Sequence, residues 1–241
     1  MKQPPLCIEG LSAGYGGKRV IRDIAFAVEP GEIFGLIGLN GVGKTTLIKA
    51  ILGLAEAEGR ISLFGSPAGP PAGRRNLAYL PEKFQPSPLL KGWELLDLTL
   101  AYYARKLDRQ AALRLCRGLD LDTVALDRGG RTYSKGMGQK LGLLATLVTG
   151  LPLLILDEPM SGLDPRARIM LKDRLLEYRD AGNTVFFSSH ILADIEEICG
   201  RIAVMHGGRV TFVGTPAALT DRFGGANLER AFLAAIDATG P

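Results

Sequence analysis

The spacing of hydrophobic positions changes twice along the chain. Up to about residue 80, apolar residues gather in short runs separated by glycine-rich turns, a pattern typical of β-strands. One stretch in this part, about Lys44 to Leu54, has the spacing of a helix instead. The runs predicted as strands are Leu6–Glu9, Ile24–Val28, Ile33–Ile37, Ile61–Phe64 and Leu77–Leu80.

From Gly92 to about Thr149 apolar residues recur at spacings of three and four, which predicts helices at Glu94–Lys106 and Arg109–Leu119. Beyond residue 150, strands and helices alternate, and this alternation predicts a parallel sheet covered by helices. We therefore expect an α/β chain with a helical insertion in its middle. The predicted strands are Leu153–Leu156, Thr184–Ser188, Ile202–Met205 and Arg209–Val213, and the predicted helices between them are Pro165–Arg179 and Ile191–Cys199.

One apolar stretch has a length that raises the question of a membrane span. From Leu141 to Leu156 sixteen residues carry no charge, whereas a transmembrane helix needs about 20 apolar residues. Gly150 and Pro152 interrupt the stretch, which favours a buried helix followed by a buried strand. The first ten residues do not resemble a secretory signal. We expect that the chain does not cross a membrane by itself.

Composition excludes several classes of protein. With 46% hydrophobic residues the chain can form a core, so disorder is excluded. Cys7, Cys116 and Cys199 are scattered and odd in number, which is typical of a reducing cytosol and not of a disulfide scaffold. The 29 basic and 25 acidic residues are interleaved. This pattern favours a solvated surface over a nucleic-acid face, so we expect no nucleic-acid partner.

A glycine-rich motif points to phosphate binding. Gly38–Thr46 matches G-x-x-x-x-G-K-[ST], and it lies between a predicted strand and a predicted helix, the context that confirms the motif. Backbone N–H groups of such a loop surround phosphate oxygens, and the helix adds its positive end. Lys44 then reaches the β- and γ-phosphates, and the Thr45 hydroxyl binds Mg²⁺. The predicted nucleotide-binding residues here are Gly38, Leu39, Asn40, Gly41, Val42, Gly43, Lys44, Thr45 and Thr46.

Two carboxylates follow the buried strand Leu153–Leu156. Asp157 and Glu158 stand at its carboxyl end, where α/β folds place their ligands. Taken alone, they would be better interpreted as a core strand that runs into an acidic turn. Together with the phosphate loop, they predict that Asp157 faces Mg²⁺ and Glu158 faces the attacking water.

Tyr15 and His190 each have two interpretations. Tyr15 lies between glycines and can either stack on adenine or pack within a turn. His190 follows the strand Thr184–Ser188. A histidine at a strand end is usually structural, but this one is expected at the edge of the sheet where it can touch a γ-phosphate.

The order of these motifs, with Tyr133-Ser134-Lys135-Gly136-Met137 ahead of the acidic strand, resembles the ATP-binding subunits of ABC transporters. The resemblance covers nearly the whole chain and implies a P-loop NTPase core sheet with an N-terminal antiparallel β subdomain and an inserted helical subdomain. It implies one domain over residues 1–241, with the core at 1–91 and 150–241 and the helical subdomain at 92–149. By position, Tyr15 resembles the adenine-stacking aromatic, Gly38–Thr46 the Walker A motif, Asp157-Glu158 the end of Walker B, Ser161–Asp164 the D-loop and His190 the switch histidine.

The chain departs from the family pattern at two places. The family signature usually reads Leu-Ser-Gly-Gly-Gln; here Ser134 and Gly136, which resemble γ-phosphate contacts, are kept beside a basic Lys135 and an apolar Met137. Glu82 stands where the family's Q-loop has glutamine. A glutamate still offers an oxygen towards Mg²⁺ or water, but its charge near a triphosphate is unfavourable unless it is compensated. The expected metal ligands are Thr45, Asp157 and Glu82.

The resemblance also implies cofactors and partners. ATP and Mg²⁺ are expected, with ATP held between Walker A of one subunit and the signature of a second, identical or different, subunit. Glu158, His190 and Lys44 are then the catalytic residues, and Asp164 a nucleotide contact. The subunit would drive a permease on another chain, more as an exporter than as an importer, from the cytoplasmic face of the membrane. Five residues are candidates for permease docking or, alternatively, for packing within the helical lobe: Phe84, Leu89, Leu90, Trp93 and Tyr102.

Two other classes fit the sequence less well. A soluble ABC ATPase acting on ribosomes or DNA is the alternative, but its usual second domain, coiled coil or zinc insert is not recognised in this sequence. A kinase or GTPase does not match the order of signature and Walker B, and no Asn-Lys-x-Asp guanine motif is present.

Overall fold

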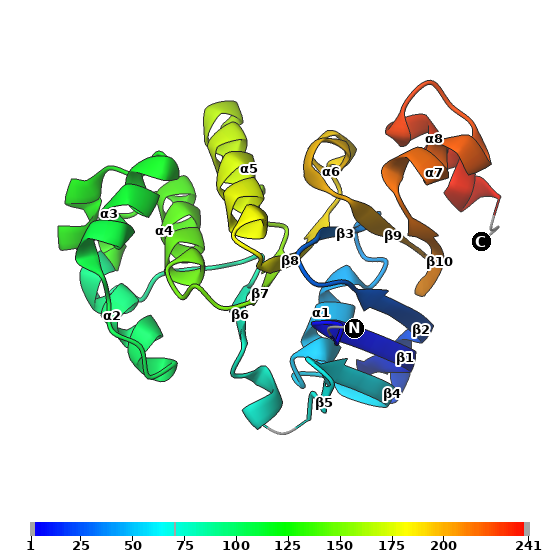
Figure 1. The fold of residues 1–241 in the computed structure, drawn as a ribbon, viewed down its shortest axis with the longest axis horizontal. Coiled ribbons are helices and arrows are strands. Elements are labelled where there is room, and N and C mark those ends of the chain that lie inside the picture. Colours follow the sequence, from blue (N-terminus) through cyan, green and yellow to red (C-terminus); the bar gives the residue numbers. More distant parts are fainter. Residues whose placement is uncertain (1–2, 70, 239–241) are drawn as a thin grey trace.

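The structure of the protein is a computed structural model that describes residues 3–69 and 71–238. In these residues the strands form two sheets (Figure 1). The first sheet is antiparallel, and its strands lie in the order β2-β1-β4-β5. Its strands are β1 (Leu6–Tyr15), β2 (Lys18–Val28), β4 (Glu56–Leu63) and β5 (Ser66–Pro67).

The second sheet has the order β10-β9-β3-β8-β7-β6, and all its neighbours run parallel except the hairpin of β9 and β10. Parallel strands need crossover connections, and helices supply them here. The strands are β3 (Ile33–Gly38), β6 (Leu77–Leu80), β7 (Leu153–Asp157), β8 (Thr184–Ser189), β9 (Arg201–His206) and β10 (Arg209–Gly214).

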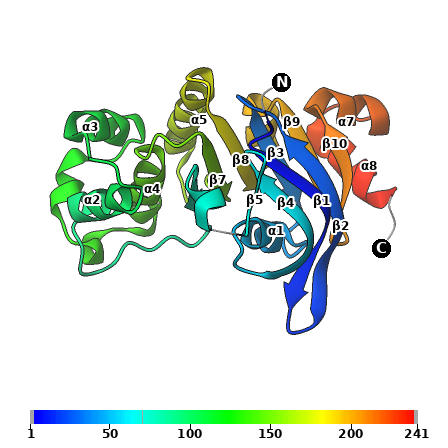
Figure 2. The same cartoon turned by 60° about the horizontal axis from the view of Figure 1, so that its bottom comes forward.

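The helices separate into groups. Helices α2, α3 and α4 lie together at one end of the molecule, away from the antiparallel sheet (Figure 1). Helix α1 packs against the antiparallel sheet (Figure 2). The helices are α1 (Lys44–Ile51), α2 (Gly92–Tyr102), α3 (Arg109–Gly118), α4 (Lys135–Leu147), α5 (Pro165–Asp180), α6 (Leu192–Ile198), α7 (Pro216–Phe223) and α8 (Leu228–Asp237), with 3-10 turns at Pro71–Arg74, Thr123–Asp127 and Gly130–Thr132.

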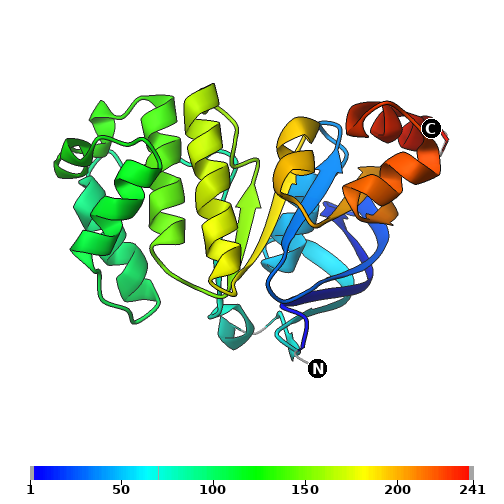
Figure 3. The same cartoon turned by 45° about the horizontal axis from the view of Figure 1, so that its top comes forward.

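The parallel sheet separates two hydrophobic cores, because successive side chains of a strand point to opposite faces. On one face Phe34 and Phe186 stack at 6.0 Å between ring centroids and pack with α1 and the antiparallel sheet. On the other face Ile37 and Phe187 belong to the second core, to which α4, α5 and α6 contribute. These helices lie over this face of the sheet (Figure 3). With both faces covered, the central strands carry almost no polar side chains until they reach their carboxyl ends.

The register of the central strands places those ends side by side. Asp157 of β7 pairs with Ser188 of β8, and Ile37 of β3 pairs with Ser189. The loop after β3, the acidic end of β7 and the end of β8 therefore meet at one edge of the sheet.

Most predicted elements are confirmed to within a few residues. The apolar stretch from Leu141 to Leu156 is helix α4 followed by strand β7, as predicted. No helix of the described residues is long and apolar enough to cross a membrane. The observed architecture has the predicted α/β class with an antiparallel and a parallel sheet.

Two predicted strands were too short, and two helices were missed. Strands β1 and β2 are much longer than predicted and form a hairpin whose tip includes Tyr15. Bulges shift the register of β1 between Ile8 and Leu11 and interrupt the alternation that reveals a strand. Helices α7 and α8 were not predicted, although Thr215 and Pro216 form a typical helix start.

Candidate functional site

The edge where β3, β7 and β8 end borders a cavity of about 460 Å³. Distant parts of the sequence contribute to it: mainly the glycine-rich loop, the acidic end of β7 and the end of β8, together with Val20 of β2 and Glu82 after β6. The residues that line it are Val20, Leu39, Asn40, Gly41, Gly43, Lys44, Thr45, Thr46, Glu82, Glu158, Ser161 and His190. We call it the phosphate-loop cavity.

The glycine-rich loop has a backbone that only glycine supports at its last turn. Gly43 has φ of 112°, and a Cβ there would lie 2.5 Å from Ile21 Cγ2. Gly43 caps α1, whose first N–H groups have no partner within the helix. No acidic residue stands in the first turn of α1. The positive end of the helix therefore faces the cavity with no acidic side chain of its own first turn beside it, which favours an anion.

Glu158 is held between a lysine and a histidine. Lys44 Nζ donates to the Gly38 carbonyl at 2.7 Å and lies 3.1 Å from Glu158 Oε1. The other carboxylate oxygen, Oε2, is 2.8 Å from His190 Nδ1. Glu158 itself takes a left-handed backbone with φ of 50°, uncommon for a residue with a side chain. The strand thus ends in a sharp turn that aims this carboxylate into the cavity.

Asp157 lies behind Glu158 and is fully buried. Ser188 Oγ donates to Asp157 Oδ1 at 2.6 Å and accepts from the Glu158 N–H at 2.9 Å. Burial raises the pKa of Asp157, the Ser188 and Thr45 side chains lower it, and the carboxylates of Glu158 and Glu82 raise it further. Ser188 therefore fixes both acidic residues, a role that sequence reasoning missed.

The residues around Asp157 fit a small divalent cation. Asp157 Oδ2 is buried and accepts no hydrogen bond from the described residues, and the Thr45 hydroxyl lies close enough to lower the pKa of this carboxyl. Hard cations such as Mg²⁺ take oxygen ligands and keep several waters or phosphate oxygens. Within the described part of the chain no group of three or more His, Cys, Asp and Glu side chains forms a metal cage. An ion here would therefore share its coordination with phosphate and water.

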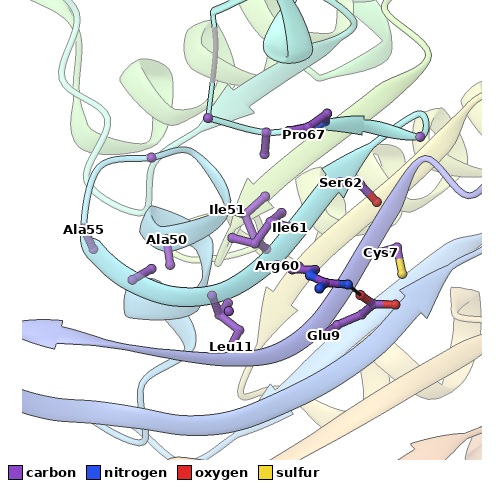
Figure 4. Close-up of a pocket in the computed structure, with 16 residues that line it drawn as sticks. Cys7, Glu9, Leu11, Ala50, Ile51, Ala55, Arg60, Ile61, Ser62 and Pro67 are labelled. Atoms are coloured by element: carbon purple, nitrogen blue, oxygen red, sulfur yellow. Dashed lines mark ion pairs between the residues drawn. The ribbon is translucent and has the colours of Figure 1, made fainter.

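A second cavity, of about 530 Å³, lies between the C-terminal half of α1 and strands β1 and β4 (Figure 4). Its lining is largely aliphatic or glycine and includes Ile51 and Ile61. Its two charged side chains, Glu9 and Arg60, lie 3.9 Å apart and neutralise each other. The phosphate-loop cavity therefore remains the candidate functional site.

Comparisons with known proteins identify the family. The family model described as ABC transporter matches residues 21–161. The chain belongs to the ABC transporter family. It is 40% identical over 201 residues to an uncharacterized ABC transporter ATP-binding protein of Synechocystis. The matched region covers 82% of this chain but 57% of that protein. This chain thus spans less than two thirds of that relative.

Two further comparisons cover more of the chain. It is 34% identical over 228 residues to the Nod factor export ATP-binding protein I of Burkholderia orbicola, which covers 92% of this chain and 74% of that protein. A solved structure of the ATP binding subunit of an ABC transporter matches with a TM-score of 0.87 at 37% sequence identity. The match covers 95% of this chain and 98% of the chain in that structure. The predicted family and fold class are confirmed.

With the family known, the predicted site residues fall into two groups. All residues of the Walker A loop except Gly38 and Val42 border the phosphate-loop cavity, as do Glu82, Glu158 and His190, and Asp157 lies directly behind it. Tyr15 lines a separate, smaller cavity at the hairpin tip, with the Lys49 ammonium 5.9 Å from its ring centroid.

The signature residues lie outside the phosphate-loop cavity of their own chain. Ser134 caps α4 and lines an adjoining cavity of about 600 Å³ that shares Glu82 and Ser161 with the phosphate-loop cavity. Gly136 follows in the first turn of α4. Asp164 caps α5 and is exposed, and the Ala167 N–H lowers its pKa. The ABC signature thus approaches the site from the helical side without reaching the Walker A loop.

Proposed function

We propose that this chain is an ATP-hydrolysing subunit that dimerises around ATP and drives a separate membrane permease. One observation carries the proposal. In the phosphate-loop cavity a lysine and a histidine from two distant segments each contact the carboxylate of Glu158, beside the positive end of α1. Phosphoryl transfer needs this combination of phosphate binding and water activation.

Lys44 has two roles in the proposal. Its ammonium contacts the Gly38 carbonyl and Glu158 in the structure. To contact the β- and γ-phosphates the ammonium must leave Glu158. Phosphate binding therefore exchanges one anionic partner of Lys44 for another and frees the carboxylate.

The freed Glu158 carboxylate orients and deprotonates water, a role typically worth about 10²–10⁴-fold in rate. His190 holds the carboxylate through Nδ1, and Ser188 holds the Glu158 backbone and Asp157. Thr45, Asp157 and Glu82 would hold Mg²⁺, which when bound neutralises the charge of the β- and γ-phosphates.

A second ATPase subunit completes the site. The first turn of α4, which Ser134 caps, presents free backbone N–H groups without an acidic residue. Such a helix end stabilises phosphate charge, yet within its own chain it does not border the Walker A loop. The γ-phosphate is therefore held by Ser134 and Gly136 of a partner, identical or not, with Asp164 at the same interface. Tyr15 stacks on the adenine.

Exposed side chains and the name of one relative support the proposed permease partner and direction of transport. Leu89 and Tyr102 are 80% and 83% exposed near the helical end, whereas Phe84 and Trp93 pack against the core and Leu90 is half-buried. The exposed pair fits a docking surface for a permease at the cytoplasmic face of the membrane. The name of the Burkholderia relative includes export, and we propose the same direction here.

Glu158→Gln tests the proposal. The variant should bind ATP and accumulate as a dimer, because glutamine keeps the contacts but cannot accept the proton from water. Size-exclusion chromatography in the presence of ATP measures the dimer, and an assay of released phosphate measures ATP hydrolysis. Glu229→Gln, at an exposed position in α8, is the matched control. Near-normal turnover by Glu158→Gln would refute the assignment.

A further inference from the structure

Helix α5 carries a lysine that is almost completely buried. Lys172 is 7% exposed, and its ammonium lies 3.5 Å from Asp194 and forms a hydrogen bond with Glu197. Asp194 is 5% exposed, and its Oδ2 finds no hydrogen-bond partner among the described residues. Lysine is rarely buried unless it is paired. This pairing joins α5 to α6.

The two helices begin beside the two residues that touch each other in the site. Helix α5 follows Glu158 after the short turn 159–164, and α6 begins two residues after His190. Only Ile191 separates His190 from α6, and its N–H donates to the Ser189 hydroxyl at 3.0 Å, so residues 189–191 form a tight turn. A shift of α6 is therefore transmitted directly to His190.

Asp194 and Glu197 are three residues apart and so lie on the same face of α6. Two contacts from one ammonium fix the rotation of this short helix as well as its distance from α5. The apolar contacts of Ile195 and Ile198 are non-directional and do not set that rotation alone.

We propose that Lys172 is a positioning residue that holds α6, and through it His190, at its 2.8 Å contact with Glu158. The proposal rests on the ATPase function proposed above. Catalysis depends steeply on such placement, since a displacement of 1 Å can cost about 100-fold in rate. Lys172 touches neither phosphate nor the attacking water, so its removal should affect turnover and not the binding of ATP.

The activity test uses three variants and a control. Lys172→Met removes the ammonium, but it leaves Asp194 buried without its partner, which threatens folding. The double variant Lys172→Met/Asp194→Asn removes both charges, and Lys172→Arg restores a cation. We expect kcat of the folded double variant to fall about ten-fold at unchanged KM for ATP, with substantial recovery in Lys172→Arg. Arg179→Met, near the end of the same helix, removes a cation that pairs with its exposed neighbour Asp180, and it should behave as the unaltered protein.

A spectroscopic test does not need turnover. The chain has two histidines, His190 and His206, and His206→Gln assigns their ring signals in NMR spectra. In the double variant the ring signal of His190 should shift and that of His206 should stay. A folded double variant with unaltered kcat and an unmoved His190 signal would overturn the proposal. If the unaltered protein hydrolyses no ATP, the proposed function fails, while the NMR comparison still decides the role of Lys172.

Discussion

At the scale of single residues, Asp157 shows a conflict between stability and function. It is fully buried, and burial raises its pKa despite the hydrogen bond from Ser188. The folded protein therefore binds a proton at Asp157 more tightly than the unfolded chain does. The free energy of unfolding is reduced as pH rises from the ordinary pKa of an aspartate to the raised value, and the loss persists above it.

Asp157→Asn should consequently stabilise the nucleotide-free protein at neutral pH, because it removes a buried charge while keeping an oxygen for Ser188. We expect Tm to rise by about 2–4 °C, which corresponds to about 1 kcal/mol in a domain of this size. The gain should disappear at low pH, where the aspartate is itself protonated. Thermal melts at several pH values measure this.

The same variant should lose the extra stabilisation that Mg²⁺ adds to ATP binding. A comparison of Tm in thermal melts with ATP plus Mg²⁺ and with ATP plus EDTA measures this loss. Asp127→Asn, at an exposed position, is the control. A lower Tm than that of the unaltered protein at neutral pH would contradict the analysis of the Asp157 charge.

The sequence predicts residues of the site that belong to contiguous motifs. A sequence motif predicts a site residue when its members are consecutive at one strand end and turn, as in Gly38–Thr46 and Asp157-Glu158. The role of Ser188 could not be predicted in this way, since it arises from the pairing of Ser188 with Asp157 on the neighbouring strand. The contact of Lys44 with Glu158 likewise depends on tertiary packing. Residues that act through long-range pairs therefore became apparent only in the structure.

At the scale of elements, the packing of α4 on β6 sets the position of the loop that carries Glu82. Gly142 lies in α4 where a Cβ would come within 2.6 Å of the Phe84 ring and 2.8 Å of Leu80 Cδ1. Phe84 follows Glu82 by two residues. The absence of a side chain at residue 142 lets this loop lie close against the signature helix.

Gly142→Ala should therefore destabilise the protein although alanine favours helices. Overpacking costs about 1–3 kcal/mol, whereas the gain in helix propensity is at most about 1 kcal/mol. Urea denaturation should show a net loss in the free energy of unfolding. Gly200→Ala is the matched control, because nothing lies within 4 Å of a Cβ there and φ is not in the left-handed region. Equal free energies of unfolding of the two variants would show that the loop with Glu82 and Phe84 moves aside without cost, and would contradict the prediction.

At the scale of the whole molecule, two surfaces formed by the described residues of the helical end are the ones proposed to meet partners. One is the first turn of α4 with Ser134, proposed above to meet a second ATPase subunit. The other is the proposed permease docking surface of Leu89 and Tyr102, which Leu98 of α2 extends. Leu98 is 59% exposed and lies four residues before Tyr102, hence on the same side of the helix. The two surfaces belong to different helices, so mutations can separate dimerisation from permease docking.

Leu98→Ser/Tyr102→Ser tests this separation. Both side chains are exposed, so their replacement should change the stability of the isolated chain by no more than about 0.5 kcal/mol. ATP-dependent dimerisation of the Glu158→Gln background should persist, because the Walker A loop and α4 are untouched. Recovery with the membrane fraction should fall when the protein is expressed in its own cell, because exposed apolar patches of this kind carry protein contacts. Ile169→Ser/Leu233→Ser, at exposed apolar positions on α5 and α8, provides the matched control. Equal membrane recovery of both double variants would place the permease contact elsewhere on the chain.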